Sequence, residues 1–333
     1  MAKLKEPTYY TRRIISWIRT FKGGLTLLCL IGLLALPLLT QNPYYLGIFV
    51  TITIFAIFAS SWNFLAGFAG QVSFGHAIFL GMGGYITAYL LRFHNVPWQI
   101  SLILGGLVSL VVAFLIGIIT LRLRGPYLAL GTMALSTFIM AIFMNERLAI
   151  ATDWIFFGTP GIDRVPPIST EAVEVFYVYT FIMVASILIM IYLSKSNLGT
   201  IFKSIRDDET GAEASGINLT KYKVIAFMIS GFFAGIAGGL FAMRFRSATP
   251  MLFQPLYSFY AIIMTTIGGL ATLGGSALGA FIFFGLNAIL IDVFDPVFIF
   301  SIILILIIRF AEMGLLRPAL ERLKDLWDVL LGR

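Results

Sequence analysis

Long apolar stretches, each broken by only a few polar residues, repeat along almost the whole chain and limit its fold more than any other feature. Of the 333 residues, 59% are hydrophobic and only 12% are charged, whereas about 25% are charged in a typical soluble domain. A helix needs about 20 mostly apolar residues to cross the hydrocarbon layer of a membrane. Backbone groups in lipid must be hydrogen-bonded internally. The chain is therefore predicted to be an all-α, polytopic membrane protein.

The apolar runs predict a bundle of about ten transmembrane helices. The spans are expected near Leu25–Leu39, Tyr45–Ala66, Ala77–Leu91, Trp98–Leu121, Tyr127–Asn145, Phe176–Leu193, Val224–Met243, Ser258–Leu273, Ala277–Ile291 and Val297–Ile308. The short runs near residue 77 and between residues 258 and 291 could instead be re-entrant. The first run lacks a small-x-small cleavage site, so we expect it to be retained as a helix and not removed as a signal peptide.

Basic residues place both ends of the chain in the cytoplasm. Residues 1–24 carry six basic residues against a single Glu6, and five acidic residues lie in the loop 146–175, which is assigned to the outside. Cytoplasmic loops of membrane proteins are enriched in Lys and Arg. The expected organisation is a basic segment over 1–24, a transmembrane domain over 25–310 with a cytoplasmic loop at 194–223, and an amphipathic tail over 311–333 that contacts membrane lipid.

Several kinds of chemistry find no support in the sequence. Cys29 is the only cysteine and His76 and His94 are the only histidines, so neither a disulfide framework nor a Cys or His metal cluster is expected. The sequence contains no Gly-Lys pair, which excludes a Gly-Lys-Ser/Thr phosphate-binding loop. No cofactor and no nucleic-acid partner are expected.

The segment from Asn63 to Tyr85 combines glycines with polar side chains at membrane depth. Its candidate residues are Gly70, Gln71, Ser73, Gly75 and His76. Unwound backbone is tolerated in a membrane only where protein or a water-filled cavity surrounds it. Two interpretations stay open: a turn followed by tight helix packing, or a break that lines the path of a permeant, in which Gln71 and His76 bind the permeant or hold the break open.

Two further segments stand out. Gly231, Gly235 and Gly239 recur at four-residue spacing, which favours close helix packing within the chain or in a dimer. The stretch from Ser194 to Lys223 is the one long charged segment between spans. Acidic residues at 207–209 favour a helix start and Gly216-Ile217 a helix end, so a helix of about two turns is predicted over Glu209–Ser215. The length of this loop favours a docking site for a soluble partner over a solvated connector.

Together these segments resemble the permease subunits of branched-chain amino acid ABC importers, the LivM type. The resemblance is carried by NFLAGFAGQVSFGHA at 63–77, RDDETGAEASGIN at 206–218 and FMISGFFAGIAGG at 227–239, and it is extended by RLRGPY at 122–127, GTPGI at 158–162 and GG-x-x-T-x-GG at 268–275. These motifs cover about residues 50–310. Glu213-Ala214 and Gly216 stand for the Glu-Ala-Ala coupling segment of the wider class, although Ser215 directly precedes Gly216 and no Pro follows.

The resemblance implies an importer in the cytoplasmic membrane of a bacterium or archaeon. It implies four kinds of component: this permease, a second related permease, two cytoplasmic ATPase subunits and an external binding protein. The residues that it assigns to ATPase coupling are Arg206, Asp208, Glu209, Glu213, Ala214 and Gly216. The implied cargo is leucine, isoleucine or valine, a zwitterion that backbone dipoles and the side chains of Gln71, Ser73 and His76 can bind without an ion pair.

Three alternatives to a branched-chain amino acid permease are considered from the sequence. The cargo could be urea or a short amide within the same class. A self-sufficient channel or secondary transporter is disfavoured because ion-coupled carriers place acidic or basic side chains inside their spans, whereas the acidic residues here cluster in loops. A membrane-bound enzyme is the least supported, because the sequence offers no paired carboxylates, metal cluster or nucleophile with a neighbouring base.

Overall fold

The computed structural model describes residues 31–120, 123, 125–147 and 158–290. The basic segment 1–24, the expected last span Val297–Ile308 and the tail 311–333 lie outside the described residues, as does part of the first expected span. Within the described ranges the chain is mainly helical, in agreement with the predicted all-α membrane class.

Five of the described helices are long and apolar enough to cross a membrane. They are α3 (Pro43–Asn63) with its π-helical continuation η1 (Phe64–Phe68), α5 (Trp98–Thr120), α6 (Pro126–Met144), α8 (Ala172–Lys195) and α11 (Leu219–Phe245). The apolar helix α4 (Ala77–Phe93) is shorter. Each of these helices overlaps a span expected from the sequence, because a long apolar run is a local signal that the tertiary structure does not override.

The two spans expected between residues 258 and 291, for which a re-entrant course was the alternative, do not appear as two separate full-length spans. They appear as α12 (Pro255–Gly268) and α13 (Leu273–Leu290), which meet end to end at an angle of 110°. Gly269 and Ala271 in the connection have positive φ angles of 94° and 59°, a backbone conformation that does not continue an α-helix. The described residues thus contain five candidate spans, or six if this bent pair is one span. The count of ten stays a prediction.

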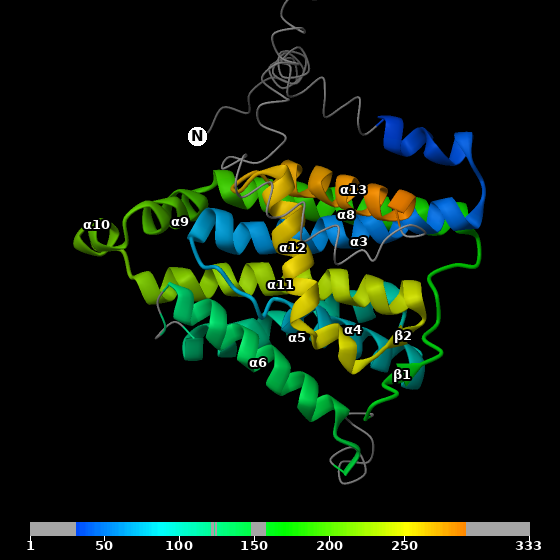
Figure 1. The fold of residues 1–333 in the computed structure, drawn as a ribbon, viewed down its shortest axis with the longest axis horizontal. Helices are drawn as coiled ribbons and strands as arrows, with labels where there is room; N and C mark the ends of the chain where they lie inside the picture. The colour runs from blue at the N-terminus through cyan, green and yellow to red at the C-terminus, as the bar shows by residue number, and fades with distance from the viewer. Residues whose placement is uncertain (1–30, 121–122, 124, 148–157, 291–333) are drawn as a thin grey trace, which may run out of the picture.

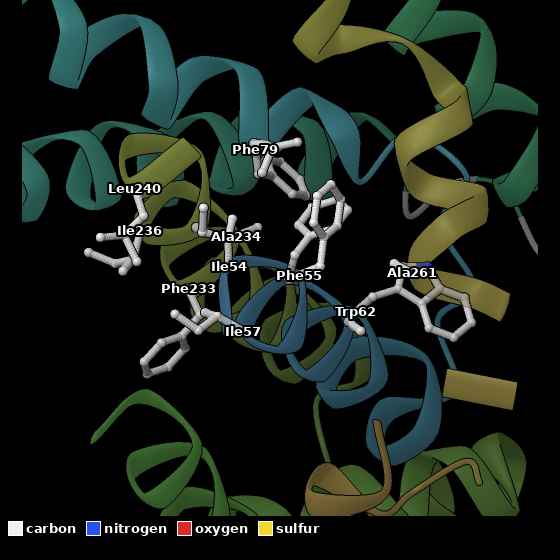
Figure 2. Packing of buried hydrophobic residues seen from close by; sticks show 14 of the residues in the cluster. Ile54, Phe55, Ile57, Trp62, Phe79, Phe233, Ala234, Ile236, Leu240 and Ala261 are labelled. Carbon is white, nitrogen blue, oxygen red and sulfur yellow. The ribbon is translucent and has the colours of Figure 1, made fainter. Parts of the chain in front are cut away.

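α3 and α11 form the centre of the bundle (Figure 1). In their most apolar stretches 83% and 72% of the residues are buried, against 39%, 28% and 39% in α5, α6 and α8. Figure 2 shows Ile54 and Ile57 of α3 close to Ala234 and Phe233 of α11. The outer helices expose large apolar side chains such as Phe181 at 74%, as expected for helices whose outer faces contact lipid.

A small antiparallel sheet joins two connections whose pairing was not predictable from the sequence. β1 (Ile162–Asp163) pairs with β2 (Ser247–Ala248), with Ile162 opposite Ala248. The 3-10 helix η2 (Pro250–Phe253) follows β2. This pair is an exception to the predicted all-α fold. It attaches the loop before α8 to the end of α11.

The charged stretch between α8 and α11 is mostly helical. It consists of α9 (Asn197–Asp207) and α10 (Glu209–Ala214), which project from one end of the bundle (Figure 1). The predicted helix over Glu209–Ser215 corresponds to α10. The preceding helix α9 was not predicted, although Phe202 and Ile205 are buried on one face of it.

Candidate functional site

The chain leaves the helical conformation within the glycine-rich segment that the sequence singled out, after Ala69. α3 widens into η1, and the chain then has no regular structure from Gly70 to His76 before α4 begins at Ala77. Gly70 has a φ of 71°, a value that suits glycine because a side chain there is strained. Short π-helical turns occur often at functional sites. The polar residues between η1 and α4 are therefore a candidate site.

The non-helical segment is held by the surrounding helices. Three hydrogen bonds attach it to α3, α6 and α12: Trp62 Nε1 donates to the Ser73 carbonyl at 2.7 Å, the Phe74 N–H to Thr132 Oγ1 at 3.0 Å, and the Ala77 N–H to Ser258 Oγ at 2.9 Å. These bonds satisfy backbone groups that would otherwise be costly to bury in a membrane. The break is thus a built feature of the bundle.

Successive residues of the break point to opposite sides. Gln71 and Ser73 are 5% and 1% exposed, whereas Val72 is 41% exposed and Gly70 is also exposed. This alternation is typical of extended backbone. The open side of the break is therefore formed by Gly70, Val72 and the half-buried Phe74, and the predicted polar candidates Gln71 and Ser73 turn toward the protein.

His76 is completely buried at the start of α4. Its Nε2 lies 2.9 Å from Ser61 Oγ, and the Ser61 carbonyl accepts a hydrogen bond of 2.7 Å from Ser230 Oγ. The rings of Phe58 and Phe79 flank the imidazole at centroid distances of 5.1 and 5.4 Å. Nδ1 has no hydrogen-bond partner among the described residues. His76 thereby links the break to α3 and, through Ser61, to α11.

Asn63, at the end of α3, connects the break to the bend between α12 and α13. Its Oδ1 accepts the Ala271 N–H at 2.9 Å, and its Nδ2 donates to the Thr272 carbonyl at 3.1 Å and to Ser276 Oγ at 2.7 Å. The sequence reasoning did not assign Asn63 a role. The available signal was a buried amide within an apolar run, since a polar group at that depth needs partners.

The end of α10 has the geometry predicted from Gly216. Gly216 has a φ of 82°, its N–H donates to the Glu213 carbonyl at 2.9 Å, and the Ile217 N–H donates to the Ala212 carbonyl at 3.1 Å. This pair of bonds is the Schellman motif, a common helix end. Ala212 is buried, while Glu213, Ala214 and Gly216 are exposed at the end of the bundle.

The other coupling candidates fall into two groups. Asp208 is exposed at the start of α10 without a side-chain capping bond, and Glu209 forms an ion pair of 2.5 Å with Lys223 of α11. Arg206 instead points toward η1, where its Nη1 donates to the Gly67 carbonyl at 2.7 Å. The candidates predicted from one charged loop therefore have different surroundings.

The three spaced glycines face other helices of the same chain. A Cβ atom on Gly235 would lie 2.4 Å from Ser109 Oγ of α5, and one on Gly239 would lie 2.5 Å from Thr87 Oγ1 of α4. A Cβ atom on Gly231 would lie 2.4 Å from the Cβ atom of Ala113 in α5. Of the two arrangements considered for these glycines, the one within the chain accounts for their contacts.

No group of His, Cys, Asp or Glu side chains that could hold a metal ion is found in the part of the chain that the structure describes. The site consists of a broken helix, a bent helix pair and the helix pair α9–α10, which contacts the break from one end of the bundle. Residues 44–311 match the family described as branched-chain amino acid transport system / permease component. The chain belongs to this family.

The relatives that carry a branched-chain amino acid transport name share only about a quarter of their aligned residues with this chain. The high-affinity branched-chain amino acid transport system permease protein LivM of Salmonella typhimurium is 26% identical over 248 residues, which cover 66% of this chain and 57% of that protein. LivM of Escherichia coli is 26% identical over 243 residues, with the same coverage. The chain thus spans about 57% of the length of these LivM proteins.

The chain is also similar to proteins whose names indicate other cargo. The nucleoside ABC transporter permease protein NupC of Lactococcus lactis is 24% identical over 158 residues, which cover 44% of this chain and 48% of that protein. No solved structure matches the chain. Family membership therefore identifies a transport permease, and the cargo needs a separate argument.

Proposed function

We propose that the chain is a permease subunit of an ATP-driven importer that carries branched-chain amino acids across the cytoplasmic membrane of a bacterium or archaeon. The observation that carries the proposal is the family match over residues 44–311, with LivM as the relative in two species. The proposed complex contains a second homologous permease, two cytoplasmic ATPase subunits and an external substrate-binding protein. We further propose that this permease has ten transmembrane spans and that both ends of the chain lie in the cytoplasm.

The helix pair α9–α10 is the proposed contact with the ATPase. Its exposed residues Glu213, Ala214 and Gly216 lie at the end of the bundle, where a soluble subunit has access. Uphill transport requires that binding and release differ between two states of the permease, and a partner must supply that free energy. Since the sequence has no Gly-Lys pair, we assign ATP hydrolysis to the partner.

The break is proposed to line part of the path. The arrangement supports a division of roles among the five candidates: Gly70 is open, while Gln71, Ser73, Gly75 and His76 are buried and hold the break in shape. On the open side, Val72 and Phe74 form an apolar surface. The ring centroid of Phe259 in α12 lies 5.3 Å from that of Phe74. Such a surface fits an aliphatic side chain, which would be bound by area burial and not by charge.

The coupling role is tested with Glu213→Ala in the complete complex reconstituted in liposomes. We expect this variant to insert normally and to lose ATP hydrolysis that depends on transport, because an exposed carboxylate of α10 is removed from the ATPase contact. The matched control is Glu171→Ala, which removes an exposed carboxylate at the other end of α8. Unchanged coupled turnover in Glu213→Ala would refute the docking role of α10.

The cargo is tested by competition. Leucine, isoleucine and valine are expected to inhibit uptake of labelled leucine, and urea, acetamide and a nucleoside are expected not to do so. A nucleoside is the second candidate because of the relative NupC, and urea or a short amide remains the alternative that the sequence allows. Competition by either class in place of the aliphatic amino acids would reassign the substrate.

A further inference from the structure

We propose that Arg206 and Gly67 form the joint through which α9 and α10 move the broken segment and the α12–α13 bend. Arg206 is thus a positioning residue inside the permease and not a contact for the ATPase. This inference rests on the proposed function, in which an ATPase docks on α10. It assigns the route by which a displacement of α10 reaches the membrane-embedded part of the chain.

The hydrogen bond between the two residues joins a cytoplasmic helix to a membrane helix. Arg206 Nη1 donates to the Gly67 carbonyl at 2.7 Å, and the neighbouring Asp207 holds the guanidinium group through an ion pair of 2.7 Å. Carbonyls at a helix end lack partners within the helix, and a cation there is favoured by the helix dipole. A charge-assisted bond of this kind is about twice as strong as a neutral one.

Two further contacts of α9 with η1 make this junction stiff. The fully buried Phe202 meets Phe64 edge to face at a centroid distance of 5.9 Å. Lys203 Nζ lies 5.6 Å from the centre of the Phe68 ring. Together with the Arg206 hydrogen bond, these contacts connect α9 to η1 at three residues along its length, Phe64, Gly67 and Phe68. A shift of α9 therefore acts on the π-helical turn as a whole.

Gly67 and Arg206 contact two further parts of the chain, the α12–α13 bend and the start of the non-helical segment. A Cβ atom on Gly67 would lie 2.1 Å from Asn63 Oδ1 and 2.6 Å from the Ala271 nitrogen, so the backbone here touches the bend between α12 and α13. On the other side, Arg206 lies beside Gly70, whose added Cβ would be 3.1 Å from Arg206 Cγ. The same arginine thus contacts the start of the non-helical segment and, through Gly67, the bend.

The linkage to α10 is short. Arg206 is the penultimate residue of α9, and Asp208 alone separates α9 from α10. Glu209 is also paired with Lys223 of α11, so α10 is connected to the bundle on both sides. Movement of α10 by a docked ATPase therefore displaces Arg206 directly, and packed helices transmit such shifts between discrete arrangements.

The test uses the complete complex with its ATPase subunits, second permease and binding protein in liposomes. Arg206→Gln removes the cation, Arg206→Lys retains a charged donor, and Lys221→Gln is the matched control, an exposed cation at the start of α11. We expect Arg206→Gln to retain the ATPase subunits but to lower leucine uptake per ATP by about tenfold or more, the size of a typical coupling between sites. Arg206→Lys should restore much of the leucine uptake per ATP hydrolysed. Lys221→Gln should have the same uptake per ATP as the unaltered protein.

A second measurement follows the break itself. In a Cys29→Ser background, Val72→Cys places a thiol at the 41% exposed position, and its rate of maleimide labelling is compared with and without ATP and vanadate. We expect a nucleotide-dependent change that disappears when Arg206→Gln is added. A labelling rate that does not respond to nucleotide in the presence of Arg206, or that responds equally in Arg206→Gln, would overturn the joint.

The two levels of the proposal fail in different ways. If Arg206→Gln keeps uptake per ATP within about twofold of the unaltered complex, a change too small for an allosteric coupling, the joint is wrong and ATPase docking stands. If the unaltered chain recruits no ATPase subunit, the proposed function falls and the joint falls with it.

Discussion

At the scale of single residues, removal of the Asn63 side chain should be costly. It is fully buried and satisfies one backbone N–H, one carbonyl and one hydroxyl in the bend between α12 and α13. Buried groups that lose their partners each cost about 1–3 kcal/mol. The bend depends on this amide because Asn63 Oδ1 is the acceptor for the Ala271 N–H, which lies in the connection between the two helices.

We therefore expect Asn63→Ala to lower the free energy of unfolding by about 2 kcal/mol or more. The measurement is the thermal unfolding midpoint of the purified protein in detergent. Thr137→Ala is the control, since its hydroxyl is exposed and bonds only within its own helix, to the Met133 carbonyl at 3.1 Å. Equal midpoints for the two variants would mean that the amide does not hold the bend.

The polar residues of the break illustrate how far a sequence pattern reaches at this scale. Glycines at 67, 70 and 75 allowed the chain to leave the helix; it does so from Gly70 onward, whereas Gly67 stays within η1. Which side of the extended segment is open was not predictable, because that depends on the contacts with α6 and α12. Val72 was passed over for this reason, while the more polar Gln71 and Ser73 were selected.

At the scale of elements, α10 depends on the conformation of Gly216. With a φ of 82°, an alanine there would cost roughly 1–2 kcal/mol, equal to about a tenfold fall in the population of the intact helix end. We expect Gly216→Ala to reduce coupled ATP hydrolysis by up to about this factor. Gly216→Asn should retain more activity because asparagine tolerates the left-handed region. Equal activity of the two variants would contradict a role for the helix end.

Packing between α11 and α5 gives a second prediction at this scale. Gly235→Ala places a Cβ atom 2.4 Å from Ser109 Oγ and 3.1 Å from the Gly105 carbonyl, which should destabilise the protein by about 1–3 kcal/mol. Gly274→Ala is the matched control in α13, since nothing lies within 4 Å of its added Cβ. Thermal unfolding in detergent should separate the two. A Gly235→Ala protein as stable as Gly274→Ala would show that the helices separate without cost.

The charged segment shows the limit of element prediction. Gly216-Ile217 predicted the end of α10 correctly because a helix end has a local signature. The apolar face of α9, with Phe202 and Ile205, is short and lies among charged residues, so it was treated as part of a loop. Only its packing against η1 makes α9 recognisable as a connecting element.

At the scale of the whole molecule, charged side chains are rare in the interior of the described bundle. Among the described residues Lys223 is the only charged residue in the buried class, and it pairs with Glu209. Carriers driven by ions usually place acidic or basic side chains inside their spans. The described bundle thus contains no internal acid to bind a coupling ion.

We expect the purified chain alone in liposomes to move no leucine above the rate of empty liposomes, under an imposed sodium or proton gradient. Addition of the ATPase subunits, the second permease, the binding protein and ATP should restore uptake. Transport by the isolated chain would revive the alternative of a channel or secondary transporter. Empty liposomes with the same gradient provide the control.

Membrane class and the positions of the long helices were determined by the sequence itself, because burying apolar side chains and satisfying backbone bonds in lipid depend on local composition. The tertiary structure decided what the sequence left open. It brought α12 and α13 end to end at 110°, paired β1 with β2 and joined Arg206 to Gly67. These arrangements depend on contacts between residues far apart in the chain, which no local pattern of hydrophobicity or charge encodes.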